Sequence, residues 1–321
     1  MFFWKLHQFD SKRRAVPMRI KRILLSVGIL SMAVATRSVD AHVGRRAHTA
    51  RSGAFGQSST RTKLTAPKHF YIRPDGSDSN DGSADDSSHA FQTIQKAVVV
   101  TNQTLDLCEQ TVTIHVADGT YTEDATGGVG LELSVASDGG QIIFEGDPAY
   151  PRNVTLNVTG TCFYFYGDNV DTLINGFKLV ATGVGIFADL NSKNVKFQNI
   201  EFGSCGIAHI EVGSRSRIVA TGNYSVSGNA QYHIFATDFA TVMIQGRTCT
   251  FSNSPVFSQA FCYARYMSMV RINGMTWANS GTVTGKRYNV LSNSIIDTVG
   301  GGATYLPGTI SGSVSTQGQY Y

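Results

Sequence analysis

The sequence predicts an all-β fold, a right-handed parallel β-helix in which successive coils stack on one another. Segments of alternating apolar and polar residues recur after residue 103, where no helical apolar period is convincing. They repeat every 23 to 28 residues, which lies in the range of a solenoid coil. Composition agrees, because glycine is frequent (33 residues), proline is rare (7 residues) and charged residues make up only 16%.

The N-terminal segment, 1–41, is predicted to be an export signal. A basic start, Met18–Arg22, precedes an uncharged, mostly apolar run, Ile23–Ala35, and small residues follow up to Ala41. The apolar run has 13 residues, fewer than the roughly 20 that a membrane-spanning helix needs. We therefore expect a secreted or periplasmic protein without a stable membrane span. A membrane-anchoring or merely basic tail is the alternative.

Residues 42–66 are predicted to form a flexible linker, because Arg, Ser, Thr, Gly and Ala dominate them. The basic charge of the chain is confined to this end. Residues 1–63 contain thirteen Lys and Arg residues and two Asp residues, which give this segment a net charge of +11. The whole chain has a net charge of +4, so the rest of the chain carries −7. Since the body is mildly acidic, we expect no nucleic-acid partner.

The β-helix domain is expected to span 67–305 and to be followed by a C-terminal tail, 306–321. An open end of a solenoid exposes unpaired backbone groups and needs a cap. A short helix over 90–101 would supply one, with Ser88 as its N-cap. Its apolar face comprises Phe91, Ile94, Ala97 and Val98.

Seven repeat units define the first strand of each coil, from 114–118 to 270–274. The first and third positions of a unit point to one side of the strand, and the second and fourth point to the other. The apolar first and third columns should face the core. They comprise Ile114, Ile142, Thr172, Val195, Ile218, Val242 and Val270, and then Val116, Phe144, Ile174, Phe197, Ala220, Ile244 and Ile272. The fourth column should face solvent and comprises Ala117, Glu145, Asn175, Gln198, Thr221, Gln245 and Asn273.

A second strand repeats in the same frame and is also expected to contribute a column to the core. This column comprises Tyr164, Phe187, Ile210, Ile234 and Phe261. Two strands that repeat with the same period indicate a coil that stacks on itself, because parallel strands need a long return connection. The repeats correspond to about eight coils. A β-sandwich is the alternative architecture, but the sequence shows no clear hairpin signals between neighbouring strands.

Three sequence stretches resemble a known superfamily. Phe70–Ser83 (FYIRPDGSDSNDGS), followed by Ala90–Ala97 (AFQTIQKA), resembles the N-terminal part of the pectate-lyase-like right-handed β-helices, and Val112–Tyr121 (VTIHVADGTY) resembles their first coil. The resemblance implies this architecture and a tendency towards polysaccharide ligands, but no activity. The hydrolase and lyase signatures of the superfamily are missing from the sequence, and its one Asp-Asp pair, at 85–86, falls in the predicted cap loop. The C-terminal YLPG and GQYY resemble the ends of some phage-tail β-helix proteins.

Candidate catalytic residues come from the second strand. If its residues alternate, His209 and Glu211 share the outer face, and His233 stacks on His209 one strand spacing away. Two imidazoles beside a carboxylate could act as a general base towards a glycan, or hold an adventitious metal ion. A solvated polar face is the simpler interpretation. A glycosidase would need a second carboxylate, for which Asp238 is a candidate.

Candidate substrate-binding residues come from the outer side of the first strand. They are Lys196, Gln198, Gln245, Arg271 and Asn273. Their amides and cations could bind sugar hydroxyls, although stacked amides can also bond one another along the axis.

The sequence thus predicts an exported β-helix protein that binds polysaccharide, with no assignable reaction. A polysaccharide lyase or glycoside hydrolase with a divergent site is the alternative, and a phage-type structural appendage is the second. The five cysteines have no metal-ligand spacing, so we expect buried thiols and no cofactor or metal. The oligomeric state stays open.

Overall fold

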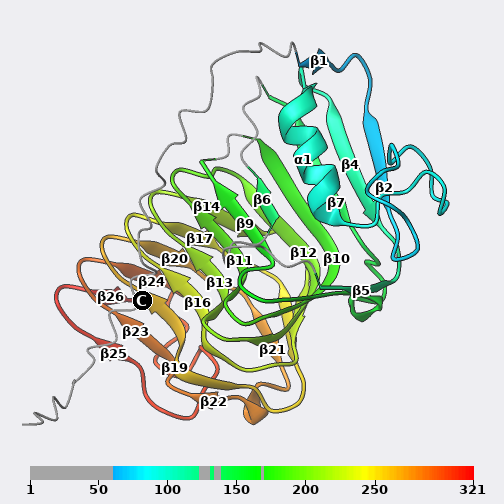
Figure 1. Cartoon of the computed structure of the whole chain (residues 1–321). Coiled ribbons are helices and arrows are strands. Elements are labelled where there is room, and N and C mark those ends of the chain that lie inside the picture. The colour runs from blue at the N-terminus through cyan, green and yellow to red at the C-terminus, as the bar shows by residue number, and fades with distance from the viewer. Residues whose placement is uncertain (1–60, 123–130, 134–138, 168–169) are drawn as a thin grey trace, which may run out of the picture. The chain divides into compact units, whose positions relative to one another are not determined.

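The computed structural model describes residues 61–122, 131–133, 139–167 and 170–321 (Figure 1). They form a parallel β-solenoid within the unit Ser58–Tyr321. The predicted export signal, 1–41, lies outside the described residues, as does most of the predicted linker, 42–66. The described end of that linker holds a short strand, β1 (Thr62–Lys63), which pairs with β3 (Leu105–Asp106). In the part of the chain that the structure describes, no helix is long and apolar enough to span a membrane.

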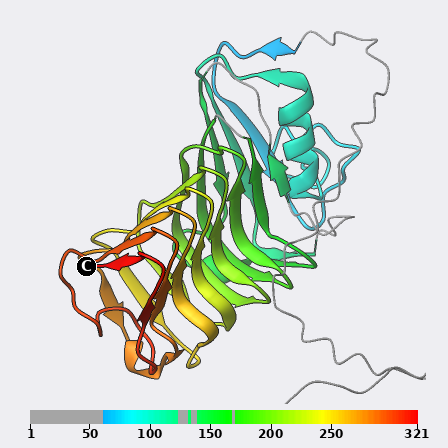
Figure 2. The same ribbon diagram turned by 90° about the vertical axis from the view of Figure 1, so that its left-hand side faces the viewer.

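One side of the solenoid is a long sheet in which ten parallel strands follow one another. They are β2 (Lys68–Ile72), β4 (Thr111–Val116), β7 (Gln141–Glu145), β10 (Asp171–Ala181), β12 (Val195–Cys205), β14 (Arg217–Ala220), β17 (Thr241–Met243), β20 (Met269–Arg271), β24 (Ile295–Asp297) and β26 (Gln319–Tyr320). Shorter strands extend this sheet sideways: β5 (Gly119–Tyr121), β8 (Val154–Val158), β15 (Tyr224–Val226), β18 (Thr248–Phe251) and β21 (Thr276–Ala278). Figure 2 shows the strands stacked rung upon rung.

A second sheet stacks eight parallel strands. They are β6 (Leu131–Leu133), β9 (Phe163–Tyr166), β11 (Val184–Asp189), β13 (Ala208–Val212), β16 (Ala230–Ala236), β19 (Val256–Ala264), β23 (Tyr288–Val290) and β25 (Ser313–Val314), with β22 (Thr284–Gly285) beside β19. These strands span about seven turns of the solenoid, close to the eight coils predicted. The predicted C-terminal tail, 306–321, contributes β25 and β26, so the stacked strands continue past residue 305.

The inward columns of the long sheet confirm the sequence pattern. Phe144, Ile174, Phe197 and Ala220 pair in register and are buried, as are the other members of the two apolar columns. One alignment differs, because Ile114 pairs with Phe144 rather than with Ile142. The first coil was therefore aligned two residues out of register, which leaves its apolar residues on the correct face.

The outward neighbours of these residues form a line of side chains that we call the polar column. It comprises Tyr71, His115, Glu145, Asn175, Gln198, Thr221, Gln245 and Asn273. Six of its members were predicted to be exposed, as was Ala117, which is half-buried: they are Glu145, Asn175, Gln198, Thr221, Gln245 and Asn273. Most are instead half-buried, and Asn175 is buried, because each side chain lies against its neighbours on the adjacent rungs.

A helix, α1 (Ile94–Thr104), lies beside β4 and β7 in Figure 1. It begins later than the predicted range, and Thr93 rather than Ser88 is its N-cap: the Thr93 side chain accepts a hydrogen bond from the backbone N–H of Lys96. Ser88 instead donates its hydroxyl to Asp86 within the preceding loop. The predicted apolar face is buried.

The turns that follow the second sheet stack into a ladder. In each turn two consecutive residues have positive φ, and the backbone N–H of the second donates to the first residue of the next turn. We call this the turn ladder. Its pairs are Leu190–Asn191, Ser214–Arg215, Asp238–Phe239, Tyr266–Met267, Ser292–Asn293 and Thr316–Gln317.

Candidate functional site

The two predicted catalytic histidines lie one above the other on adjacent rungs, with their rings edge to face, but inside the core. His209 on β13 and His233 on β16 both have no solvent-exposed surface, and their Nδ1 atoms are 3.1 Å apart. The stacking is therefore confirmed, whereas the surface location is wrong. The following residues, Ile210 and Ile234, are buried in the same core, so two consecutive residues face inward on each strand and strict alternation fails there.

A tyrosine extends this pair into a buried polar chain. The Tyr224 hydroxyl lies 3.2 Å from His233 Nε2, and the rings of Phe202 and Phe257 enclose the imidazoles. Burial lowers the pKa of His209 to about 3, and burial together with the neighbouring imidazole lowers the pKa of His233 well below its usual range. Both rings are thus neutral near pH 7 and closed off from a polymeric substrate.

Glu211 is separated from the histidines and faces outward on the second sheet. It pairs in register with Phe187 on one side and Phe235 on the other, in a line continued by Tyr164 and Tyr263. Phe187 and Tyr164 were predicted to face the core. They face outward because Ile186, rather than Phe187, pairs with Ile210.

The environment of Glu211 favours its protonated form. Burial, reinforced by the Asp189 carboxylate, raises the pKa of Glu211 to about 7, against the opposing effect of Arg265. Asp189 is thus the carboxylate that acts on Glu211, whereas the carboxylate of Asp238 accepts a hydrogen bond from the Thr237 hydroxyl.

The five predicted substrate-binding residues all lie on the outer side of the long sheet, and each has a partner there. Lys196 Nζ is 2.9 Å from Asp171, and Arg271 Nε is 3.2 Å from Asp297. Two further contacts involve amides: Gln245 donates to Asn273 at 2.7 Å, and Gln198 accepts from Thr221 at 3.3 Å. The structure therefore brings these residues to one face, where the amides bond along the axis.

A pocket of about 220 Å³ lies at the β2 end of the polar column. It is lined by Tyr71, Asp85, His115, Val116, Ala117, Glu145 and Gly146. Three successive members of the column meet here because β2, β4 and β7 are neighbours in register. The pocket therefore combines an aromatic ring, an imidazole and two carboxylates.

His115 is held from two sides. Its Nδ1 atom is 3.1 Å from a Glu145 carboxylate oxygen, and its Nε2 atom is 3.0 Å from Nδ1 of His69. When Nδ1 of His115 carries the proton, it donates to Glu145, and Nε2 accepts from His69. The Tyr71 ring stacks on His115 with centroids 5.0 Å apart. A ligand that displaced His69 from Nε2 could exchange a proton with this positioned imidazole.

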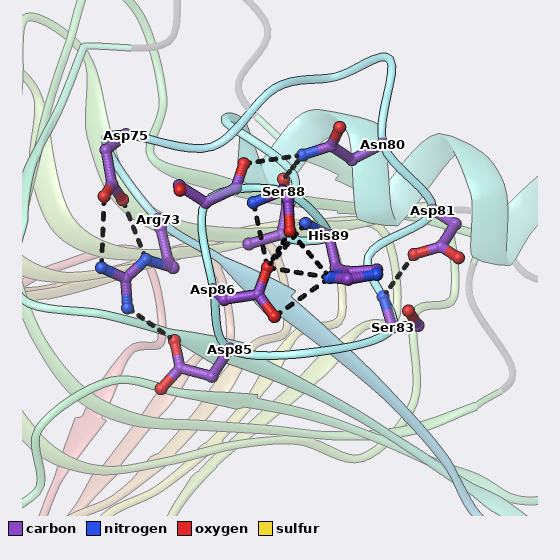
Figure 3. Close-up of polar contacts among 11 residues, drawn as sticks. Arg73, Asp75, Asn80, Asp81, Ser83, Asp85, Asp86, Ser88 and His89 are labelled. Atoms are coloured by element: carbon purple, nitrogen blue, oxygen red, sulfur yellow. Dashed lines mark hydrogen bonds and ion pairs between the residues drawn. The ribbon is translucent and has the colours of Figure 1, made fainter.

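The loop between β2 and α1 supplies the second carboxylate of the pocket (Figure 3). Arg73 binds Asp75 at 2.8 Å and Asp85 at 3.0 Å, so its guanidinium bridges two carboxylates. These hydrogen bonds raise the pKa of Arg73 and lower that of Asp75. Asp85 was placed away from the coils by the sequence analysis, but the loop folds back and carries it to the pocket.

His69 and His115 were not predicted as site residues. Aligning Val112–Val116 with Ile142–Gly146, two residues from the alignment adopted, would have placed His115 in the same column as Glu145. The polar character of that column was visible in the sequence, whereas the register of the first coil was not.

The remaining candidate chemistry is limited. Among the residues that the structure describes, no cluster of three or more His, Cys, Asp or Glu side chains is arranged to hold a metal ion. The thiols of Cys162, Cys205, Cys249 and Cys262 are free and buried, and burial raises the pKa of Cys205 to about 12. Comparison of the chain with known protein families, with curated proteins and with solved structures found no match.

Proposed function

We propose that the protein binds a polysaccharide chain along the outer side of the long sheet, with one sugar in the pocket. The observation that carries this proposal is the continuity of the polar column, which runs from the pocket to Asn273 along the stacking direction. Neighbouring members are one strand spacing apart, about 4.8 Å. A linear polymer lying along the column would therefore meet a hydrogen-bonding side chain at every rung.

The side chains of the column suit sugar hydroxyls. An amide offers both donors and acceptors, and the bonded amides Gln245 and Asn273 keep unused capacity for a ligand. At the pocket, Tyr71 adds an aromatic ring with a hydroxyl group, a combination that suits a site in which one end of the side chain is apolar and the other is hydrated.

We further propose the finer features of the architecture on the strength of the sequence resemblance. The solenoid is right-handed, α1 caps the end near β2, and the fold is related to the pectate-lyase-like superfamily. The basic and apolar segments within 1–41 direct export, so the glycan belongs to the cell envelope or the surroundings.

Binding is tested by affinity electrophoresis of the purified protein through gels that contain a panel of polysaccharides. At least one polymer should retard the protein. Replacing both Gln245 and Asn273 by Ala should weaken that binding about tenfold, the effect of losing roughly two ordinary hydrogen bonds. The control is Asn289→Ala, which removes a side-chain amide from the second sheet. Equal binding by all three proteins, or no retardation by any polymer, would refute the proposal.

Glycan cleavage is the second candidate function, and the pocket is the observation that favours it. His115 is positioned by Glu145, and Asp85 adds a second carboxylate, so an imidazole and two carboxylates lie within one cavity. Reducing ends and unsaturated products should be measured together on each polymer that binds. Activity should vanish in His115→Ala and persist in Asn289→Ala, the variant on the second sheet. Cleavage that survives His115→Ala would exclude this pocket as its site.

A further inference from the structure

We infer that the proposed binding face selects an uncharged glycan over a polymer of uronic acids. This inference rests on the proposed function and specifies the ligand class of the same site. It follows from the balance of charges in the pocket and along the polar column.

The pocket is acidic. Two of its lining residues, Asp85 and Glu145, are carboxylates, and the guanidinium of Arg73 is already shared between Asp85 and Asp75. Glu145 lies 3.1 Å from Nδ1 of His115, which holds this carboxylate at the wall of the pocket. A carboxylate on the ligand would therefore meet two negative groups and would have to displace one of them to reach Arg73.

The cations along the column are neutralised in the same way. Lys196 is paired with Asp171, and Arg271 is paired with Asp297. One cation of this face, Arg217, lies against the sulfur of Met243 at 3.2 Å instead of a carboxylate. Of these three cations, Arg217 is the one without a carboxylate partner, and it cannot match the charge of a polyuronate, which repeats at every sugar. Amides and hydroxyls, by contrast, continue along the column and suit an uncharged chain.

The test uses pairs of polymers that share a backbone and differ in charge. Methyl-esterified and de-esterified galacturonan form one pair, and hydroxyethyl-cellulose and carboxymethyl-cellulose form the other. Affinity electrophoresis at pH 7.5 and low salt should show binding to the uncharged member at a concentration about tenfold lower, the effect of one uncompensated like-charge contact near a surface.

Two variants of equal charge change make the test local. In the double variant Asp85→Asn with Glu145→Gln, the ratio of the affinity for the uncharged polymer to the affinity for the charged polymer should fall several-fold. Asp189→Asn with Asp238→Asn removes two carboxylates at the second sheet and the turn that follows it, and should leave this affinity ratio at its wild-type value. An identical shift in both double variants would show an effect of net charge alone and overturn the inference.

The two proposals fail in different ways. Equal or tighter binding of the charged member overturns the selectivity and leaves polysaccharide binding intact. Absence of binding to all four polymers and to the wider panel contradicts the proposed function, and the selectivity with it.

Discussion

The imidazoles of His209 and His233 occupy positions where most solenoid rungs carry apolar side chains. They lie among Phe202, Phe257 and Phe261, and their hydrogen bonds to one another and to Tyr224 satisfy three of the four ring nitrogens, leaving Nε2 of His209 buried without a partner. Such a pair is tolerated only while both rings are neutral, because a buried charge without a partner is costly. The stability of the fold should therefore depend on pH.

Acid should destabilise the protein through this pair. Folding lowers the pKa of each histidine below its unfolded value near 6.5, so the unfolded chain binds more protons in acid. The stabilisation is complete above pH 6.5 and is lost as the pH falls towards 3. Urea unfolding at pH 7 and pH 4.5 should differ by about 3 kcal/mol or more from this source.

The control for this prediction is a double variant, His209→Phe with His233→Phe, whose rings suit the aromatic surroundings and cannot be protonated. Its loss of stability between the two pH values should be clearly smaller than that of the wild type. An equal loss in both proteins would assign the acid sensitivity to other groups.

Glu211 should act in the opposite direction. Its folded pKa, about 7, exceeds the ordinary value of 4.5, so its contribution favours the folded state below pH 4.5 and is lost as the pH rises through 7. Glu211→Gln cannot ionise. The stability of this variant relative to the wild type should therefore increase by about 1–2 kcal/mol between pH 5 and pH 8, allowing for solvent screening. A difference that does not change with pH would contradict the raised pKa.

Within one strand of the long sheet, neighbouring residues should contribute very differently to stability. Phe197 is fully buried and packs edge-on against Phe202 and Tyr224, with ring centroids 5.8 Å and 5.5 Å away. Phe197→Ala should lower the free energy of unfolding by about 3–5 kcal/mol. Gln198→Ala, one residue on, removes one contact with Thr221 and should cost about 1 kcal/mol or less. Similar losses in urea unfolding would show the assigned register to be wrong.

The turn ladder gives a prediction about backbone conformation. Met267 has a φ of 58° and an exposed side chain. The equivalent positions three rungs before it and one rung after it hold Asn191 and Asn293. Asparagine tolerates this left-handed conformation better than methionine. Met267→Asn should therefore raise the free energy of unfolding by about 0.5–1 kcal/mol. The reciprocal change, Asn293→Met, should lower it, and the opposite order would contradict the argument.

The sequence predicted the long sheet more reliably than the second sheet, for a physical reason. Within the repeat segments of the long sheet, such as Val195–Gln198, buried and half-buried residues alternate, so Ile174 and Phe197 could be assigned to the core from the pattern alone. On the second sheet, both His209 and Ile210 face inward, and a period of two cannot represent that. Ile210 and Glu211 face inward and outward as predicted, so the error on this strand is confined to His209, which does not share a surface with Glu211. The pocket was missed because Asp85 reaches it through a loop with no repeat.

For the solenoid as a whole, stability should be greatest in the central rungs. Each inner strand has a neighbour on both sides, whereas β2 pairs with β4 and β26 pairs with β24. Interactions between adjacent rungs then dominate the stability of each rung. Amide hydrogen exchange should be slower in β12 and β14 than in β26 by about tenfold or more. Uniform protection along the stack would instead indicate that the rungs unfold as one cooperative unit.

The regular register also determines how the solenoid would respond to a pulling force. Strand partners such as Arg217 and Thr241 are 24 residues apart, and each rung is bonded only to the rungs beside it. Tension applied at one end of the chain would therefore load the hydrogen bonds of the outermost rung before those of the next. Each rung that detached would release about 80 Å of extended chain. The force trace would then be a series of nearly equal steps, so the coil length would be measured directly as a mechanical extension.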